Sequence, residues 1–234
     1  MLSPVKEGSV IGVAFSPDGK TLAAGYVGGV VLWDVAARKR VEDDSLPVKE
    51  GSVIDVAFSP DGKTLAAGYD GGDGVGGGVV LWDLATHRRL MRDPLTVRRG
   101  RVSSVAFSPD GKTLAAGYDS DFGSGVTLWD LATRRDLLGD PPSVREGRVS
   151  SVNFSPDSKI LAVGYGGDGG TAYGSVVLWD LDLKSWQRRA SQIANRNFTR
   201  DEWRHYFPGE PYRATFRELP VPPEGTSNGV ERAR

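Results

Sequence analysis

The sequence predicts an all-β fold made of four similar small sheets, and two observations carry this prediction. The segment VAFSPDGKTLAAGY occurs unchanged at residues 13–26, 56–69 and 105–118, and a diverged copy, VNFSPDSKILAVGY, occupies residues 152–165. Aligned on Phe15, Phe58, Phe107 and Phe154, the copies lie 43, 49 and 47 residues apart. A period of this size is typical of stacked units that each bury their apolar surface against a neighbour.

The first copy shows how one unit is expected to fold. A strand at Val10–Phe15 ends in the turn SPDG, whose Pro, Asp and Gly suit a tight reversal of the chain. A second strand covers Leu22–Tyr26, and a third covers Val30–Asp34. Basic residues at Arg38–Arg40 mark the next turn, and a weaker outer strand follows around Leu46–Lys49, where charge and proline discourage further pairing.

The strands are apolar on both faces instead of alternating, so each small sheet should lie between two neighbours. Four-stranded antiparallel sheets repeated with this period are the blades of a β-propeller. We therefore predict a propeller domain at residues 1–181, with four blades near residues 4–46, 47–95, 96–142 and 143–181. A short helical extension at residues 182–220 and a disordered tail at residues 221–234 are expected to follow it.

The stretch SVAFSPDGKTLAAG…VTLWDLAT at residues 104–133 resembles the WD-repeat family, and the similarity covers residues 4–181. Members of that family usually carry a Gly-His pair before the first strand and a Ser on the second, which form a buried polar network with a Trp of the third strand. Here the first position reads EG or RG, and the Ser is replaced by Ala24, Ala67, Ala116 and Val163. Loss of all polar partners together can be nearly neutral, since it avoids unpaired buried groups.

The third-strand tryptophans remain, and we expect them to act as apolar packing residues of the blades. They are Trp33, Trp82, Trp129 and Trp179.

Variation concentrates in the loops between the second and third strands, at Asp70–Gly78, Asp119–Gly125 and Gly166–Ser175. The resemblance places these loops on the face that also carries the connections between blades. Insertions on one face of a rigid repeat scaffold are where binding usually resides. We predict that a protein or peptide partner binds there, through Asp70, Asp73, Asp119, Asp121, Phe122 and Tyr173. The two aromatic residues would be anchors, or alternatively would fold back onto the blade.

Motifs that would indicate chemistry are absent or incomplete. The GDGVGG match at residues 72–77 is followed by a strand, whereas a dinucleotide site needs a helix there. The DSDFG segment lacks the later acidic ligands of a calcium loop. His87 and His205 have no nucleophile in a fitting motif, and the chain has no cysteine. We therefore expect no catalytic residue, no metal site and no cofactor.

The charge is nearly balanced, with 29 Lys and Arg against 30 Asp and Glu, so no global field favours nucleic acid or a membrane. Basic clusters recur at Arg38–Arg40, Arg88–Arg89 and Arg134–Arg135, and could form a positive ring for nucleic acid or an acidic protein. Interleaved acidic residues favour a solvated face instead. With no secretion signal and no membrane-spanning run, a cytoplasmic location is the expectation.

The C-terminal extension begins with an expected helix that aligns Trp186, Ala190, Ile193 and Ala194 on one face. A second helix should follow at Arg200–Phe207, with Thr199 and Glu202 at the spacing of a capping box. The segments IANRNFT, DEW and PYRATF…LP resemble the segment that ends large bacterial WD-repeat proteins with signal-transduction ATPase modules. That resemblance implies a sensor or an interaction platform.

Two functions are thus open. The first is a non-enzymatic scaffold that recognises a protein or peptide on the inserted loops. The second is an incomplete propeller, an assembly part that self-associates or completes a larger ring of the 4–8 blades seen in propellers. Leu2–Lys6 matches the outer strand of the other units and is the candidate to complete the fourth blade, whether in the same chain or in a neighbour. An open arc is the third arrangement.

Overall fold

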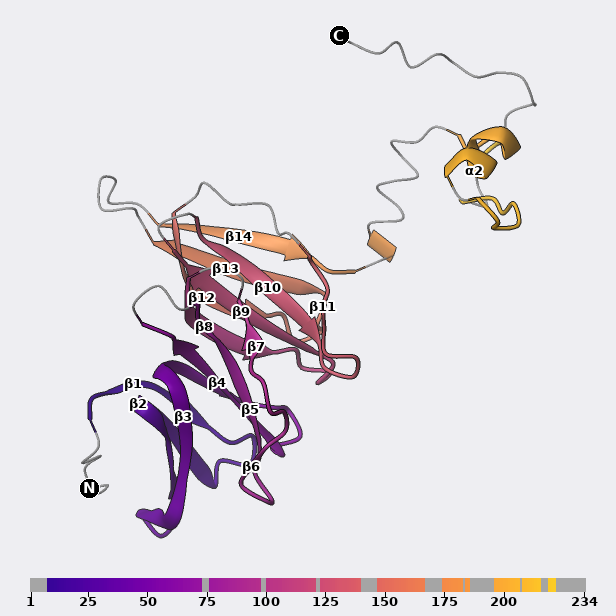
Figure 1. Ribbon diagram of the computed structural model, residues 1–234. Helices are drawn as coiled ribbons and strands as arrows, with labels where there is room; N and C mark the ends of the chain where they lie inside the picture. Colours follow the sequence, from indigo (N-terminus) through magenta and orange to yellow (C-terminus); the bar gives the residue numbers. More distant parts are fainter. Residues whose placement is uncertain are drawn as a thin grey trace. The chain divides into compact units, whose positions relative to one another are not determined.

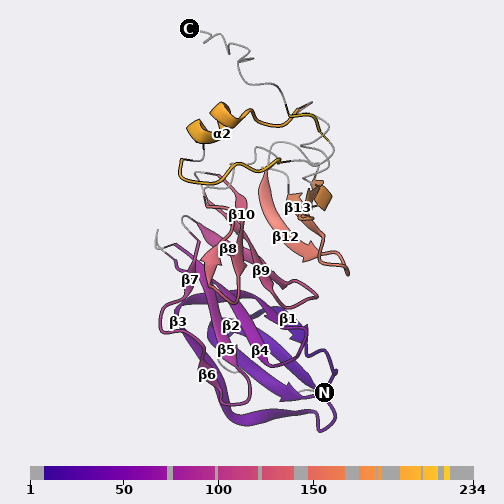
Figure 2. The same cartoon turned by 90° about the vertical axis from the view of Figure 1, so that its right-hand side faces the viewer.

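The structure is a computed structural model, and it describes residues 8–72, 76–97, 100–120, 123–139, 147–166, 174–182, 184–185, 196–206, 208–215 and 219–221. The chain divides into two compact units, residues 1–181 and residues 182–234. The first unit contains only antiparallel β-sheet among its described elements. The blades follow one another in chain order, from the indigo strands of the first to the orange strands of the fourth (Figures 1 and 2).

The strands of the first two blades join in one sheet of seven: β1 (Val10–Phe15), β2 (Thr21–Asp34), β3 (Lys39–Phe58), β4 (Thr64–Asp70), β5 (Gly78–Asp83), β6 (Arg88–Arg89) and β7 (Leu95–Thr96). The third blade is a sheet of four: β8 (Arg101–Phe107), β9 (Thr113–Asp119), β10 (Gly125–Asp130) and β11 (Arg135–Asp136). The fourth blade has three described strands: β12 (Arg148–Phe154), β13 (Ile160–Gly166) and β14 (Ser175–Asp180). The all-β class and the four repeats are confirmed.

Strand β2 contains the second and third strands of the first blade. The carbonyl of Lys20 accepts a hydrogen bond from the amide of Val35 at 2.8 Å, although fourteen residues separate them. A straight strand of that length would span roughly 45 Å, so β2 must fold back on itself. Gly28, with φ of +98°, lies where the chain reverses.

The outer strand of the first blade is longer than the sequence predicts. Pairing resumes at Lys39, opposite Asp34, and β3 then continues without interruption into the first strand of the second blade. The reason is the tightness of the preceding turn, in which the Asp34 carboxylate accepts a hydrogen bond from the amide of Ala37 at 2.7 Å and Arg38 takes φ of +54°. Only one of the three basic residues therefore belongs to the turn itself.

The three SPDG turns and the SPDS turn of the fourth blade close through the same hydrogen bonds. In the first blade the Ser16 hydroxyl donates to Asp18 at 2.7 Å and accepts from the amide of Thr21 at 2.9 Å. The hydrogen bond from Ser16, together with that from the amide of Lys20, lowers the pKa of the Asp18 carboxyl. The same three bonds recur in the other blades, at residues 59–64, 108–113 and 155–160. These turns are fixed by residues within five positions of one another.

The core consists of seams between neighbouring blades. At each seam, valines from the first strand of one blade lie over a glycine on the second strand of the blade before it. A Cβ built on Gly68 would come within 2.7 Å of Val102 and 2.8 Å of Val105, so only glycine fits there. Gly25 and Gly117 hold the same position at the other two seams.

Two expectations for the ends of the first unit fall partly outside the described residues. The fourth blade has no outer strand among its described elements, and β14 is the last strand of its sheet. Leu2–Lys6, the candidate to complete it, lies outside the described residues.

The described part of the second unit is built around the short helix α2 (Arg200–Tyr206). The capping box is confirmed, because the Glu202 amide donates to the Thr199 hydroxyl at 3.1 Å and the Thr199 amide donates to the Glu202 carboxylate at 2.9 Å. The predicted helix carrying Trp186, Ala190, Ile193 and Ala194 lies outside the described residues, as does the expected disorder beyond Val221.

Candidate interaction surfaces

The loop between β9 and β10 is anchored by one buried carboxylate. Asp119 ends β9 with its side chain only 7% exposed, and it accepts a hydrogen bond from the Ser124 hydroxyl at 2.8 Å. Its other oxygen lies 3.4 Å from the guanidinium of Arg101 and 3.5 Å from that of Arg148. Arg101 is on β8 and Arg148 is on β12 of the next blade, so one carboxylate ties a variable loop to two blades.

Asp119 was predicted as a partner-binding residue, and the structure gives it this anchoring position inside the protein instead of an open one. Asp70, the corresponding residue of the second blade, is half-buried and accepts a hydrogen bond from the amide of Gly72 at 3.0 Å. Both aspartates therefore shape the bases of their loops. The other predicted contact residues, Asp73, Asp121, Phe122 and Tyr173, lie outside the described residues.

The connections between blades approach these loops closely. A Cβ on Gly100, which has φ of +101°, would lie 2.3 Å from the carbonyl oxygen of Asp119. Gly147 makes the same approach to Gly166 in the fourth blade. The glycine that follows Glu or Arg at the start of the second, third and fourth blades is thus required by the contact between the connection and the loop.

At the opposite end of the blades, two grooves lie between neighbouring SPDG turns, and sequence reasoning missed both. The first, of about 390 Å³, separates the first and second blades and is lined by Pro17, Leu32, Phe58, Pro60, Leu84 and His87, among others. The second, of about 360 Å³, separates the second and third and is lined by Pro60, Leu81, Met91, Phe107, Pro109 and Arg134, among others. The signal was the FSPD segment itself, because its Pro lines both walls of each groove and its Phe lines one of them.

The basic clusters near these grooves are partly used within the chain. Arg89 donates two hydrogen bonds to the Glu50 carboxylate, at 2.5 and 2.8 Å, and one to the carbonyl of Pro47 at 2.9 Å. Its guanidinium also lies 5.4 Å from the ring centre of Trp82. The hydrogen bond from Arg89 lowers the pKa of the Glu50 carboxyl. This arginine thus links the junction between blades to the third strand, which leaves less positive charge for a ligand.

Trp82, Trp129 and Trp179 lie at the three seams, and Trp33 lies in a separate cluster within the first blade. Trp33, Trp82 and Trp129 are buried and Trp179 is half-buried. The indole N–H groups of Trp33 and Trp82 are buried and have no hydrogen-bond partner. With Ala in place of the second-strand Ser, the indole N–H of these two blades has lost its expected partner. The expectation that losing all the polar partners together leaves no buried polar group unpaired is wrong for Trp33 and Trp82. Packing holds both rings in place, together with the Arg89 guanidinium over the ring of Trp82.

A polar connection that sequence reasoning missed crosses the seams beside the valines. The Asp55 carboxylate on β3 accepts hydrogen bonds from the amide of Val105 at 2.8 Å and from the Ser104 hydroxyl at 3.1 Å, both on β8. Ser104 in turn accepts a hydrogen bond from the amide of Val152, on β12, at 3.3 Å. Burial raises the pKa of the Asp55 carboxyl, against the effect of these hydrogen bonds.

The comparisons with known proteins agree with this geometry. The model of the family described as WD domain, G-beta repeat matches residues 3–34, 44–83, 92–130 and 141–180. The chain belongs to the WD-repeat family. No curated protein matches its sequence. WD-repeat proteins generally serve as scaffolds for protein–protein interaction.

Among solved structures, this WD-repeat protein is similar to a chain of Kuenenia stuttgartiensis hydrazine synthase, with 22% sequence identity and a TM-score of 0.61. The match covers 76% of this WD-repeat chain and 55% of the other, so this chain corresponds to about half of that protein's length. As many as 899 solved chains match, so the likeness identifies the fold and carries no activity with it.

Within the described part of the chain, no three His, Cys, Asp or Glu residues are grouped as a metal site would need. None of the described helices is long and apolar enough to span a membrane.

Proposed function

We propose that this WD-repeat protein is a non-enzymatic scaffold or sensor module that binds a protein or peptide on its loop face. The face comprises the loops Asp70–Gly78, Asp119–Gly125 and Gly166–Ser175, with Asp70, Asp73, Asp121, Phe122 and Tyr173 as contact residues. A binding loop loses less entropy when it is held in place before the partner arrives.

One observation carries the proposal: the anchoring of the β9–β10 loop by Asp119. Arginines from two blades and the Ser124 hydroxyl hold this carboxylate at 7% exposure. The loop, whose length differs between blades, is therefore held in a fixed position at its base. This arrangement, a variable loop on a rigid scaffold, is the one that binding proteins commonly use.

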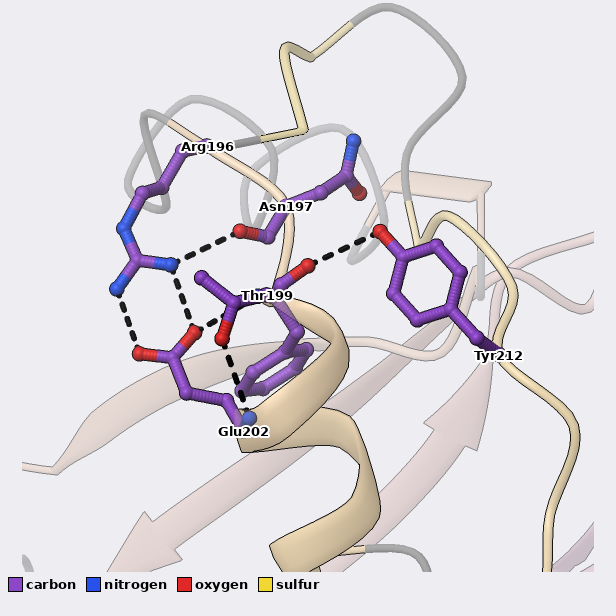
Figure 3. A network of polar contacts seen from close by, with 6 residues as sticks. Arg196, Asn197, Thr199, Glu202 and Tyr212 are labelled. Atoms are coloured by element: carbon purple, nitrogen blue, oxygen red, sulfur yellow. Dashed lines mark hydrogen bonds and ion pairs between the residues drawn. The ribbon is translucent and has the colours of Figure 1, made fainter. Parts of the chain in front are cut away.

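The second unit supports a finer proposal, that the chain belongs to the bacterial signalling type of WD-repeat protein. The three segments that resemble the ending of those proteins contact one another. Figure 3 shows Arg196 and Asn197 beside Thr199 and Glu202 at the start of α2, with the hydroxyl of Tyr212 directed at the Phe198 carbonyl, 3.0 Å away.

The rest of the second unit completes that small core. Trp203 is buried, lies edge-on to Phe198 and to Tyr212, with ring centres 6.4 and 5.8 Å away, and donates from its indole to the Glu210 carbonyl at 3.1 Å. The side chain of Asn197 donates to the Leu219 carbonyl at 2.6 Å. The recognisable segments of the extension are therefore the ones that hold it together, which accounts for their presence without a catalytic role.

The binding proposal is tested by peptide selection. The whole chain and a variant in which all three loops are replaced by the short VGG of the first blade are each used to select from a displayed random-peptide library. Peptides that bind the chain should lose binding to the loop variant, and also to Phe122→Ala and Tyr173→Ala, and these two point substitutions should leave the melting temperature unchanged. Arg134→Ala, at the opposite end of the blades, is the matched control and should bind normally. Peptides that bind all variants equally would contradict the loop site.

A further inference from the structure

The two terminal blades expose faces whose counterparts are buried at every seam inside the domain. On β1, Val13 is 61% exposed, whereas Val56 at the same position of the second blade is 4% exposed. On β14, Leu178 is 65% exposed, whereas Leu128 of the third blade is 3% exposed. We call these the leading face (Val10, Val13 and Phe15) and the trailing face (Gly164, Val176 and Leu178).

The trailing face lacks the side chains that fill its equivalents. Gly25, Gly68 and Gly117 each lie under two valines of the following blade. Gly164 holds the same position on β13, but a Cβ built on it would meet only Ser150, Ser151 and the Ser151 backbone. The nearest atoms thus belong to serines of the same blade, so the place that a valine pair takes at the other seams is not filled by valines of a following blade.

The leading face carries the valine pair that corresponds to those of the internal seams. The second and third blades contribute to their seams through Val53 and Val56, and through Val102 and Val105. Val10 and Val13 are their counterparts, since the segment VAFSPDGKTLAAGY is identical in these blades. The first blade also has a separate cluster, made of Ala24, Tyr26, Val31 and Trp33. Unlike the clusters at the three seams, it contains no residue from a preceding blade.

The polar connection across the seams is also left open at the trailing face. Asp55 accepts from Val105, and Ser104 accepts from Val152, so the second and third blades each offer a side-chain oxygen to an amide of the next blade. Ser151 is the next member of this series, and it is exposed, with no hydrogen-bond partner among the described residues. The amide that would continue the series in an added blade is that of the residue corresponding to Val152, which in the first blade is Val13.

We propose that a second copy of this chain docks on the trailing face through its leading face. Val10 and Val13 of the second copy lie over Gly164, its Phe15 and Val13 cover Val176 and Leu178, and its Val13 amide donates to the Ser151 hydroxyl. The occupant is a second copy because both halves of the missing seam are present on this one chain, with the residues that already pair at its internal seams.

The contact is between two different surfaces, so it leads to a closed ring or to an open filament. Propeller rings contain about 4–8 blades. Two chains of four blades each reach the upper end of this range, whereas three chains exceed it. The expected assembly is therefore a ring of two copies with two identical intermolecular seams.

The test is the mass of the whole chain in solution by sedimentation or light scattering. The single chain has a mass of 25.1 kDa, and the expected value is twice that. Val13→Asp and Leu178→Asp should each reduce the mass to that of one chain. Both side chains are exposed in the single chain, so neither substitution should unfold it, which circular dichroism checks. Val176→Asp is a second variant of the trailing face, and Leu137→Asp, exposed outside both faces, should leave the mass doubled.

Mixing the two blocked variants distinguishes this contact from others. Val13→Asp keeps a free trailing face and Leu178→Asp keeps a free leading face, so the mixture should form a complex of two chains although neither variant associates alone. A single-chain mass for the unmodified protein would overturn the proposal, whether the arc closes on itself or a different protein covers it. An effect of only one substitution, or no complex in the mixture, would also overturn it. Masses that grow with concentration would overturn the two-copy ring.

Discussion

The seam glycines allow a sharp test of the blade packing, and Gly117 is the best position for it. In Gly117→Ala the new Cβ would lie 2.5 Å from a methyl carbon of Val149 and 3.2 Å from one of Val152. Both valines are buried on β12, and a β-branched side chain has few other rotamers to adopt. The blades must therefore move apart slightly, or the valines must strain.

The expected magnitude follows from two opposing effects. Overpacking of a well-packed core costs about 1–3 kcal/mol. Replacing Gly by Ala also lowers the entropy of the unfolded chain, which is worth about 0.4–1 kcal/mol in the other direction. We expect a net destabilisation of roughly 1–2 kcal/mol, measured as a shift of the urea midpoint at constant slope, with tryptophan fluorescence and circular dichroism as probes.

A double-mutant cycle with Val149→Ala assigns the effect to the seam. Removing the valine methyls makes room for the new Cβ, so the double variant should be more stable than the sum of the single changes by about 1–2 kcal/mol. Gly166→Ala is the matched control, because its Cβ would have an ordinary 3.9 Å contact. Additive single effects, or a neutral Gly117→Ala, would refute the packing of valine on glycine as the seam's basis.

Three further outcomes are expected. Trp129→Ala should destabilise by about 3–5 kcal/mol, because the ring is buried in the seam between the second and third blades. Trp179→Ala should cost clearly less, because that ring packs against the seam between the third and fourth blades but is only half-buried; equal losses would contradict this difference in burial. The hydrogen bonds from Arg196 lower the pKa of Glu202 to about 2, so its contribution to α2 is present above about pH 4.5 and is lost as the pH falls through 2; NMR titration of the helix amides should show this, and Glu202→Gln should abolish it. Burial raises the pKa of Asp55, so the free energy of unfolding should fall as the pH rises above 3.8 and this carboxyl ionises. Asp55→Ser should remove this fall, measured by urea unfolding at several pH values. An unchanged pH dependence would contradict the role of Asp55.

The sequence by itself determined the features whose contacts are short-range along the chain. The SPDG turns and the capping box of Thr199 and Glu202 depend on residues at most five positions apart. Local hydrogen bonds and φ preferences decide such structures almost alone. The repeat period added the stacking of blades, since strands that are apolar on both faces need a neighbour on each side.

Only the tertiary structure decided the features that depend on contacts between different blades. The sequence predicted that Asp119 is an exposed loop residue, but its carboxylate is buried and lies 3.5 Å from the guanidinium of Arg148 on the next blade. Nothing local distinguishes Asp55 from an ordinary strand residue until Val105 lies beside it. Likewise Val13 and Val56 stand in identical segments, and one is exposed while the other is buried. Whether a residue is buried depends on which blade lies next to it, and the sequence of a single repeat does not specify that neighbouring blade.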